Sequence, residues 1–96
     1  MPAYVIYQGD VTDPDRYEQY KLRAADSIAQ AGGRYRVRGG DVEVLEGEGP
    51  AGRVVVVEFP DAATARAWYD GELYREARAL REGAVTARMF VVDGVD

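Results

Sequence analysis

The stretch from Arg53 to Pro60 constrains the fold most, because four consecutive valines are followed there by Glu58 and Phe59. β-branched residues favour strands, and an apolar run without alternation predicts apolar neighbours on both faces of the strand. We therefore expect a central strand here. The 96 residues suffice for a single domain (1–96) with about two helices, and two helices cover only one face of a sheet. Cover for the other face must come from outside the chain.

Composition excludes several classes of function. Asp and Glu number 17 against 12 Lys and Arg, which gives a net charge of −5 and disfavours nucleic acid as a partner. Histidine and cysteine are absent, so imidazole bases, thiolate nucleophiles and the usual zinc, copper and haem ligands are missing. We expect no metal and no cofactor. No apolar run approaches the roughly 20 residues of a membrane span, so we expect a cytoplasmic protein without membrane contacts.

The first third of the chain predicts a strand followed by a helix. The strand is the apolar run from Ala3 to Tyr7. Asp13 can cap a helix, and Pro14 suits the first helical position. An apolar stripe at steps of three and four follows, formed by Tyr17, Tyr20, Ala24, Ile28 and Ala31. Glycine takes the left-handed conformation of a C-terminal cap, so Gly32-Gly33 should end the helix.

The next segment predicts a second strand with an irregularity. Residues 34–38 alternate between arginine and apolar residues, Gly39-Gly40 interrupts them, and residues 41–46 resume the alternation. One long strand kinked by a glycine bulge fits, and so do two strands joined by a turn. We prefer the bulge, because residues 47–52 form the better turn into the central strand.

The last third predicts a broken helix and a final strand. Asp61 can cap a helix that contains Ala62, Ala65, Trp68 and Tyr69. Gly71 interrupts the pattern, which then continues to about Arg81, so we expect two helical pieces. Residues 86–92 read as the closing strand.

This order of elements, β-α-β-β-α-β, is the ferredoxin-like arrangement of an α+β protein, with both helices on one face of a four-stranded antiparallel sheet. Val54 and Val56 occupy one face of the central strand, whereas Val55 and Val57 occupy the other. At about 25 cal/mol per Å², covering four or five such side chains favours association by several kcal/mol before entropy costs. We expect a homodimer whose two sheets pack face to face as a dimeric α/β barrel; the alternative is a monomer with one wet sheet face.

Short motifs along the chain carry a family resemblance; they are Tyr4-Val5-Ile6, Gly32-Gly33-Arg34-Tyr35, Arg38-Gly39-Gly40, Glu58-Phe59-Pro60, Ala67-Trp68-Tyr69 and Tyr74. In this combination the chain resembles the family catalogued as domain of unknown function 1330. The resemblance implies the dimeric α/β-barrel superfamily, whose relatives include antibiotic-biosynthesis-type monooxygenases, muconolactone-isomerase-like proteins and stress-response barrels. It also implies a ligand cleft between sheet and helices in each protomer, and it leaves the reaction open.

Arg38 and Glu58 are the candidate catalytic residues. A guanidinium beside two glycines can present itself and nearby backbone N–H groups to a carboxylate or enolate oxygen. The alternative, which we prefer, is a bulge that needs glycine, with Arg38 solvated or paired. Glu58 at the end of an apolar strand would be partly desolvated, which suits a proton shuttle. An ion pair of Glu58 with Arg36 or Arg38 is the preferred alternative.

Aromatic residues supply the other candidates. The predicted ligand-binding residues are Tyr20, Arg38, Trp68, Tyr69, Tyr74 and Arg78. Aromatic residues at helical spacing more often pack in a core, which is the preferred interpretation of Tyr20 and Trp68. Tyr74 and Arg78 lie one turn apart beyond the Gly71 break and are the better candidates for function. The acidic run between residues 41 and 48 lacks calcium-site spacing and reads as a solvated face.

Two functional hypotheses follow. The first is a dimer that binds a small anionic or aromatic molecule between sheet and helices, with cofactor-independent acid/base or oxygenase-like chemistry. The second is a non-catalytic dimeric structural or interaction module. A cleft between sheet and helices favours the first hypothesis, and a solid core there favours the second.

Overall fold

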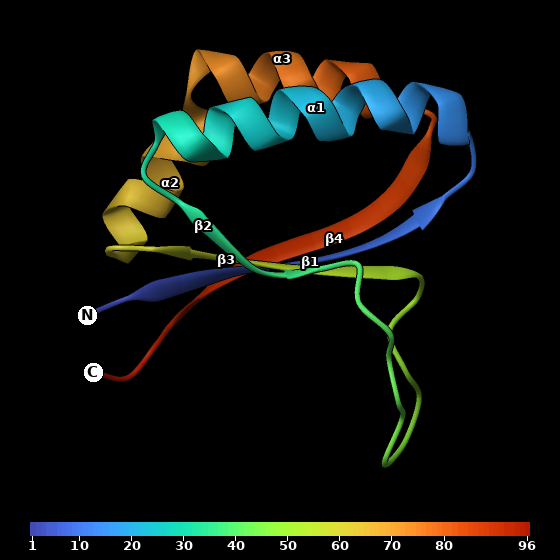
Figure 1. Ribbon diagram of the computed structural model, residues 1–96, viewed down its shortest axis with the longest axis horizontal. Helices are drawn as coiled ribbons and strands as arrows, with labels where there is room; N and C mark the ends of the chain where they lie inside the picture. The colour runs from blue at the N-terminus through green and yellow to red at the C-terminus, as the bar shows by residue number, and fades with distance from the viewer.

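The computed structural model describes residues 1–96 as a four-stranded sheet with three helices on one face (Figure 1). The elements in chain order are β1 (Ala3–Val11), α1 (Pro14–Gln30), β2 (Arg34–Arg38), β3 (Arg53–Phe59), α2 (Ala62–Asp70), α3 (Glu72–Arg81) and β4 (Val85–Asp93). The strand order is β2-β3-β1-β4, and every neighbouring pair is antiparallel. The ferredoxin-like α+β prediction is confirmed, and the valine strand β3 is central as expected.

The helix boundaries follow the predicted caps. The Asp13 carboxylate accepts a hydrogen bond from the Arg16 N–H at 3.3 Å, and Asp61 accepts one from the Thr64 N–H at 2.7 Å. Gly71 has extended backbone, with φ −71° and ψ 159°, and separates α2 from α3. The expected break at Gly71 is therefore confirmed.

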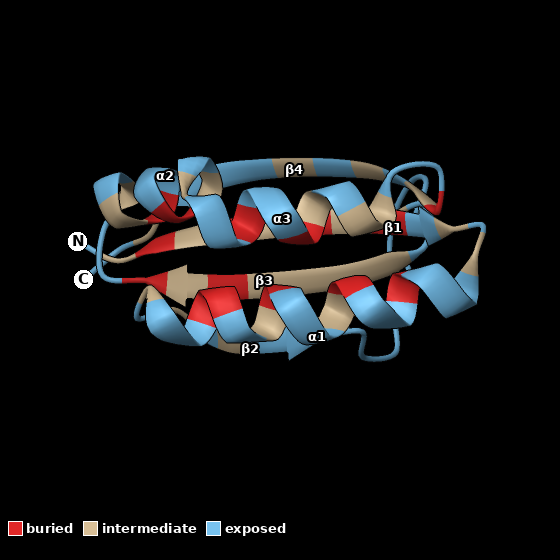
Figure 2. Ribbon diagram, turned by 90° about the horizontal axis from the view of Figure 1, so that it is seen from above, coloured by how far each residue is buried: buried red, intermediate tan, exposed pale blue.

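The core lies between the sheet and the helices. Alternation along β1 turns Ala3, Val5 and Tyr7 toward the helices, and Val57 and Phe59 do the same on β3. Figure 2 shows α1 and α3 side by side over the sheet, with their buried positions facing inward. Trp68, which is buried in the same cluster, stacks on Phe59 and Tyr74.

The opposite face of the sheet has no cover within the chain (Figure 1). We call it the outer face. Its apolar side chains include Ile6, Val54 and Val56, which are half-buried, and Val37, Phe90 and Val92, which are 38%, 52% and 47% exposed. The sheet therefore carries apolar side chains on both faces, as the valine run predicted.

Two details of the second strand differ from the prediction. The bulge lies at Arg36, where the register shifts between Tyr35 and Val37, and not at Gly39-Gly40. An ion pair between Arg36 Nε and Glu58 Oε1, at 2.8 Å, accompanies it. The bulge reverses the expected alternation: Val37 lies opposite Val56 on the outer face, so Arg38 turns toward the helix side with Val55.

The strand predicted over residues 41–46 is wrong. β2 ends at Arg38, and residues 39–52 form an irregular loop that projects from the end of the sheet, which we call the arm (Figure 1). The alternating pattern finds no partner, because β3 begins only at Arg53 and its register with β2 ends at the Arg38–Val55 pair. A strand without a neighbour cannot satisfy its backbone groups with a ladder.

Candidate functional site

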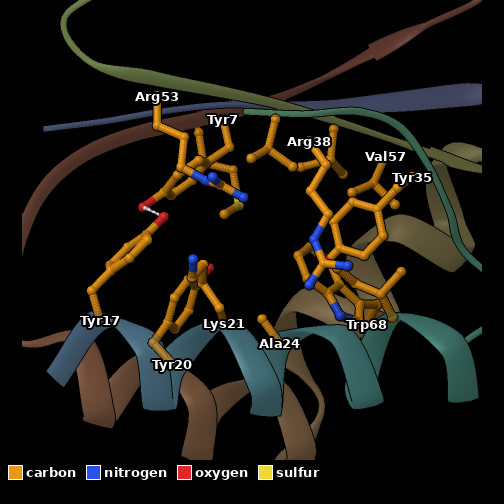
Figure 3. Close-up of a pocket in the computed structure, with 14 residues that line it drawn as sticks. Tyr7, Tyr17, Tyr20, Lys21, Ala24, Tyr35, Arg38, Arg53, Val57 and Trp68 are labelled. Atoms are coloured by element: carbon orange, nitrogen blue, oxygen red, sulfur yellow. Dashed lines mark hydrogen bonds between the residues drawn. The ribbon is translucent and has the colours of Figure 1, made fainter. Parts of the chain in front are cut away.

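A cavity of about 30 Å³ lies between α1 and the helix-facing side of β1, β2 and β3 (Figure 3). Eleven of its 14 lining residues are hydrophobic; the full set is Val5, Tyr7, Tyr17, Tyr20, Lys21, Ala24, Ile28, Tyr35, Arg38, Arg53, Val55, Val57, Trp68 and Met89. A cavity of this volume holds one or two waters, whereas sites for drug-sized ligands are roughly ten times larger. The space between sheet and helices is thus a narrow cleft.

Three cationic side chains line this cavity. Arg38 and Arg53 enter from the neighbouring strands β2 and β3, and Lys21 comes from α1 (Figure 3). The Arg38 guanidinium stacks on the Tyr35 ring, 4.4 Å from its centroid. Neither arginine forms an ion pair, whereas Lys21 Nζ pairs with Glu18 Oε1 at 2.7 Å. Two unpaired guanidiniums therefore face a largely apolar space.

Gly39 explains how Arg53 reaches the cavity. Gly39 has φ +71°, which glycine adopts readily, and a β-carbon there would collide with the Arg53 guanidinium. Arg53 Nε is buried and has no hydrogen-bond partner. The glycine next to Arg38 thus provides both the backbone turn and the room for the second arginine.

Tyrosine hydroxyls form the polar part of the cavity floor. Tyr17 donates to the Tyr7 hydroxyl at 3.1 Å, and the hydroxyls of Tyr20 and Tyr74 lie 2.7 Å apart. Burial raises the pKa of Tyr7, Tyr20 and Tyr74 above the ordinary value for a phenol. These groups stay protonated at neutral pH and act as hydrogen-bond donors rather than bases.

A second, open hollow of about 510 Å³ lies between α3 and the start of β4. Tyr69, Arg75, Arg78 and Arg81 contribute to its wall. The Arg78 guanidinium stacks on the Tyr69 ring at 4.0 Å and donates from Nη2 to the Tyr69 carbonyl at 3.3 Å. The predicted residues Tyr69 and Arg78 therefore lie together, but in a different place from Arg38.

The predicted site residues thus separate into three groups. Tyr20, Arg38 and Trp68 line the cavity together, and Tyr74 lies behind them, in contact with the Tyr20 hydroxyl and the Trp68 ring. Tyr69 and Arg78 belong to the second hollow. Glu58 lies on the outer face in its ion pair with Arg36, so the preferred pairing interpretation is confirmed. Within one protomer, Glu58 and Arg38 thus lie on opposite faces of the sheet.

Several cavity residues were not predicted from the sequence, although the sequence contains a signal for them. Arg53 alternates with Val55 and Val57, so it shares their face of the strand. Lys21 lies four residues after Tyr17, on the same stripe of α1. No sequence signal showed on which face of the sheet Arg38 lies, because the bulge at Arg36, two residues earlier, determines that face.

The fold defines the chain as a ferredoxin-like α+β protein. Solved structures with this fold include a protein of unknown function from Rhodopseudomonas palustris, with 21% identity, TM-score 0.74, and coverage of 99% of this chain and 83% of the other. A second is a dimeric ferredoxin-like protein of unknown function from Thermobifida fusca, with 22% identity, TM-score 0.62, and coverage of 96% and 92%. A third is the cofactor-independent oxygenase SnoaB from Streptomyces nogalater, with 13% identity, TM-score 0.69, and coverage of 99% and 94%.

The family is established by sequence. The family model described as a domain of unknown function (DUF1330) matches residues 2–95, so the chain belongs to that family, as the resemblance indicated. None of the curated proteins matches the chain. None of the three helices has the length and apolar character needed to cross a bilayer.

Proposed function

We propose that this protein is a homodimer that binds a small organic anion at the cavity between α1 and the sheet. One observation carries the proposal: Arg38 and Arg53 both line a mostly apolar cavity, and neither has a carboxylate partner. Seventeen acidic residues are available in the chain, so two neighbouring arginines without an acid are a specific arrangement. A bound anion would offset their mutual repulsion and supply the missing hydrogen-bond acceptors.

The lining supports an anion with an apolar or aromatic body. A guanidinium fork matches the two oxygens of a carboxylate or an enolic acid. The Tyr35 ring and the valines of β3 offer apolar contacts beside it. At about 30 Å³ the cavity accepts only a small group unless its cationic side chains move outward. Arg38 is an exposed residue with a long side chain, and it is the group best able to move.

No carboxylate lines the cavity. A reaction there would therefore depend on orienting the ligand with Arg38 and Arg53 and on donating hydrogen bonds from tyrosine phenols, rather than on a carboxylate base of the same protomer. SnoaB, which has the same fold, is described as a cofactor-independent oxygenase.

The outer face supports the homodimer. Phe90 and Val92 are about half exposed there, next to the half-buried Ile6 and Val56. A second copy packed on this face would remove the apolar side chains of both sheets from water. The Thermobifida fusca protein, which has the same fold, is described as dimeric.

The narrowness of the cavity favours one competing function, the non-catalytic dimeric interaction module. The two functions share the dimer and differ in the cavity. The anion-binding function needs Arg38 and Arg53, whereas the module needs neither residue.

The test is a binding series with matched variants. Thermal shift and calorimetry would compare benzoate, salicylate and neutral benzamide on the wild type, Arg38→Ala, Arg53→Ala and the control Arg23→Ala, which removes an exposed arginine of α1. Loss of one charged hydrogen bond costs about 1.5–3 kcal/mol, so each site variant should weaken binding of the acids about 10- to 100-fold. Arg23→Ala should bind the acids as the wild type does, and neutral benzamide shows how much binding remains without the ligand's charge. Equal affinity in all variants, or no binding of either acid, would refute the anion site and leave the module.

A further inference from the structure

The arm exposes apolar side chains without any contact to explain them. Val42 and Val44 are 51% and 52% exposed, and Leu45 is 86% exposed. The arm projects beyond the sheet on the side away from the helices, which is the side of the outer face (Figure 1). Folding of this chain alone leaves these side chains in water, so their burial must come from another molecule.

The arm is also poorly held by its own chain. Its backbone hydrogen bonds are confined to its root, where Gly39 N–H donates to the Val54 carbonyl and Gly52 N–H donates to the Pro50 carbonyl. Residues 40–49 make no backbone hydrogen bond at all. Gly49 approaches the Val44 side chain, so the two sides of the arm lie close to each other near its tip.

The charge of the arm has one sign. Its ionisable residues are Asp41, Glu43, Glu46 and Glu48, and it contains no lysine or arginine. None of the four carboxylates forms an ion pair within the chain. An acidic, apolar segment of this kind fits a surface that is both apolar and basic.

The outer face of a second copy is apolar and carries three arginines, Arg34, Arg36 and Arg88, against two carboxylates, Asp10 and Glu58. Arg34 and Arg88 are exposed on it and form no ion pair, and they flank the exposed apolar side chains of Val37, Phe90 and Val92. We propose that the arm clasps the outer face of the partner subunit, with Val42, Val44 and Leu45 on its apolar side chains and the arm carboxylates beside its arginines. This inference rests on the proposed homodimer, and it assigns the contact that holds the two copies together.

The clasp has a consequence for the anion site. The arm begins directly after Arg38 and ends directly before Arg53, so both cavity arginines lie at its root. Gly52, at the C-terminal end of the arm, has φ +96° and lies against the Gly9 carbonyl of β1, so this end of the arm is held at the sheet. Seating the arm on the partner therefore orders the segment that presents Arg38 and Arg53, and dimerisation completes the site.

The first test measures dimer dissociation by sedimentation equilibrium. Val44→Ser with Leu45→Ser should weaken the dimer at least tenfold, whereas Leu22→Ser, a matched exposed leucine on α1 that is 70% exposed, should leave it unchanged. Circular dichroism checks that each variant is folded. A wild-type protein that is monomeric at 100 μM, roughly an upper working concentration, overturns the homodimer and the clasp together. A wild-type dimer that the double variant does not weaken overturns the clasp alone.

The second test is a charge exchange. Glu43→Arg with Glu46→Arg should weaken the dimer, and so should Arg34→Glu with Arg88→Glu, because each places like charges across the contact. The variant with all four changes restores opposite charges and should recover most of the lost affinity. Failure of the combined variant to recover, with each pair weakening the dimer, overturns the placement of the carboxylates beside these arginines.

Discussion

The hydrogen bond between the Tyr20 and Tyr74 hydroxyls offers the most direct energetic test of the structure. The oxygens lie 2.7 Å apart, and the two residues are 6% and 1% exposed, so the loss of one hydroxyl leaves the other buried without this partner. A buried hydroxyl left without its partner costs about 1–3 kcal/mol, while removal of both hydroxyls is far milder. We therefore expect Tyr20→Phe and Tyr74→Phe to be strongly non-additive.

The two single variants should also differ from each other. Tyr74 lies near the guanidiniums of both Arg78 and Arg81, whereas Tyr20 lies near that of Arg81 alone. The Tyr74 hydroxyl therefore keeps the more cationic surroundings after Tyr20→Phe, and the loss should be about 1 kcal/mol. Tyr74→Phe deprives Tyr20 of its only hydrogen bond and should cost about 2 kcal/mol. The double variant leaves no unpaired hydroxyl and should cost no more than about 1 kcal/mol, which gives a coupling energy of about 2 kcal/mol.

Urea denaturation at pH 7 measures these free energies of unfolding. Trp68 is the single tryptophan, and its ring lies 4.1 Å from that of Tyr74, so its fluorescence reports on this part of the core. All variants must be compared at one protein concentration, because dimer formation adds to apparent stability. Arg23→Ala, on the exposed side of α1, is the control and should change stability by less than about 0.5 kcal/mol. Losses that add within about 0.3 kcal/mol would refute the buried pair.

Two further predictions concern the same fold. Burial raises the folded-state pKa of the phenols above the ordinary 10.0 in Tyr7, Tyr20, Tyr35 and Tyr74. The folded chain therefore holds more protons than the unfolded chain above pH 10, so the free energy of unfolding should be flat from pH 7 to 9 and fall as the pH rises past 10; a flat profile to pH 11 contradicts the burial. Gly52→Ala should destabilise the protein by more than about 2 kcal/mol, because the added β-carbon would collide with the Gly9 carbonyl. Gly47 also has a positive φ, +68°, but open space around it, so Gly47→Ala should cost only about 1 kcal/mol. Equal losses of stability in urea denaturation would contradict the contact between Gly52 and Gly9.

Sequence patterns were sufficient for the fold because each element carries its own boundary signal. Asp13, Asp61 and Gly71 mark helix ends through local hydrogen bonds and backbone freedom, which depend on near neighbours only. The valine run of β3 indicated a buried central strand for a similarly local reason. The alternation over residues 41–46 led to the wrong prediction of a strand. Alternation shows that a segment could line a surface, but it does not show that a neighbouring strand is present.

The candidate site was less predictable because it depends on contacts across strands. Alternation correctly placed Val55 and Val57 on one face of β3, which the structure turns toward the helices, yet it could not place Arg38, whose direction depends on the bulge at Arg36. Nor could it reveal that Tyr69 and Arg78 face a different hollow, since α3 turns away from α2 at Gly71. Predicted site residues can thus lie in different cavities when a single backbone irregularity changes the direction of the chain between them.

The Arg38-Gly39-Gly40 motif shows how the structural and functional interpretations meet. The bulge expected at the two glycines lies at Arg36 instead, but Gly39 does adopt a positive φ, which glycine tolerates. The same absence of a side chain admits the Arg53 guanidinium, which brings two unpaired cations to one cavity. Glu58, first considered as a proton shuttle, holds Arg36 on the outer face beside the bulge and so accompanies the turn of Arg38 toward the cavity. Gly39 therefore serves both the backbone turn and the proposed anion site, so a substitution at Gly39 should disturb both.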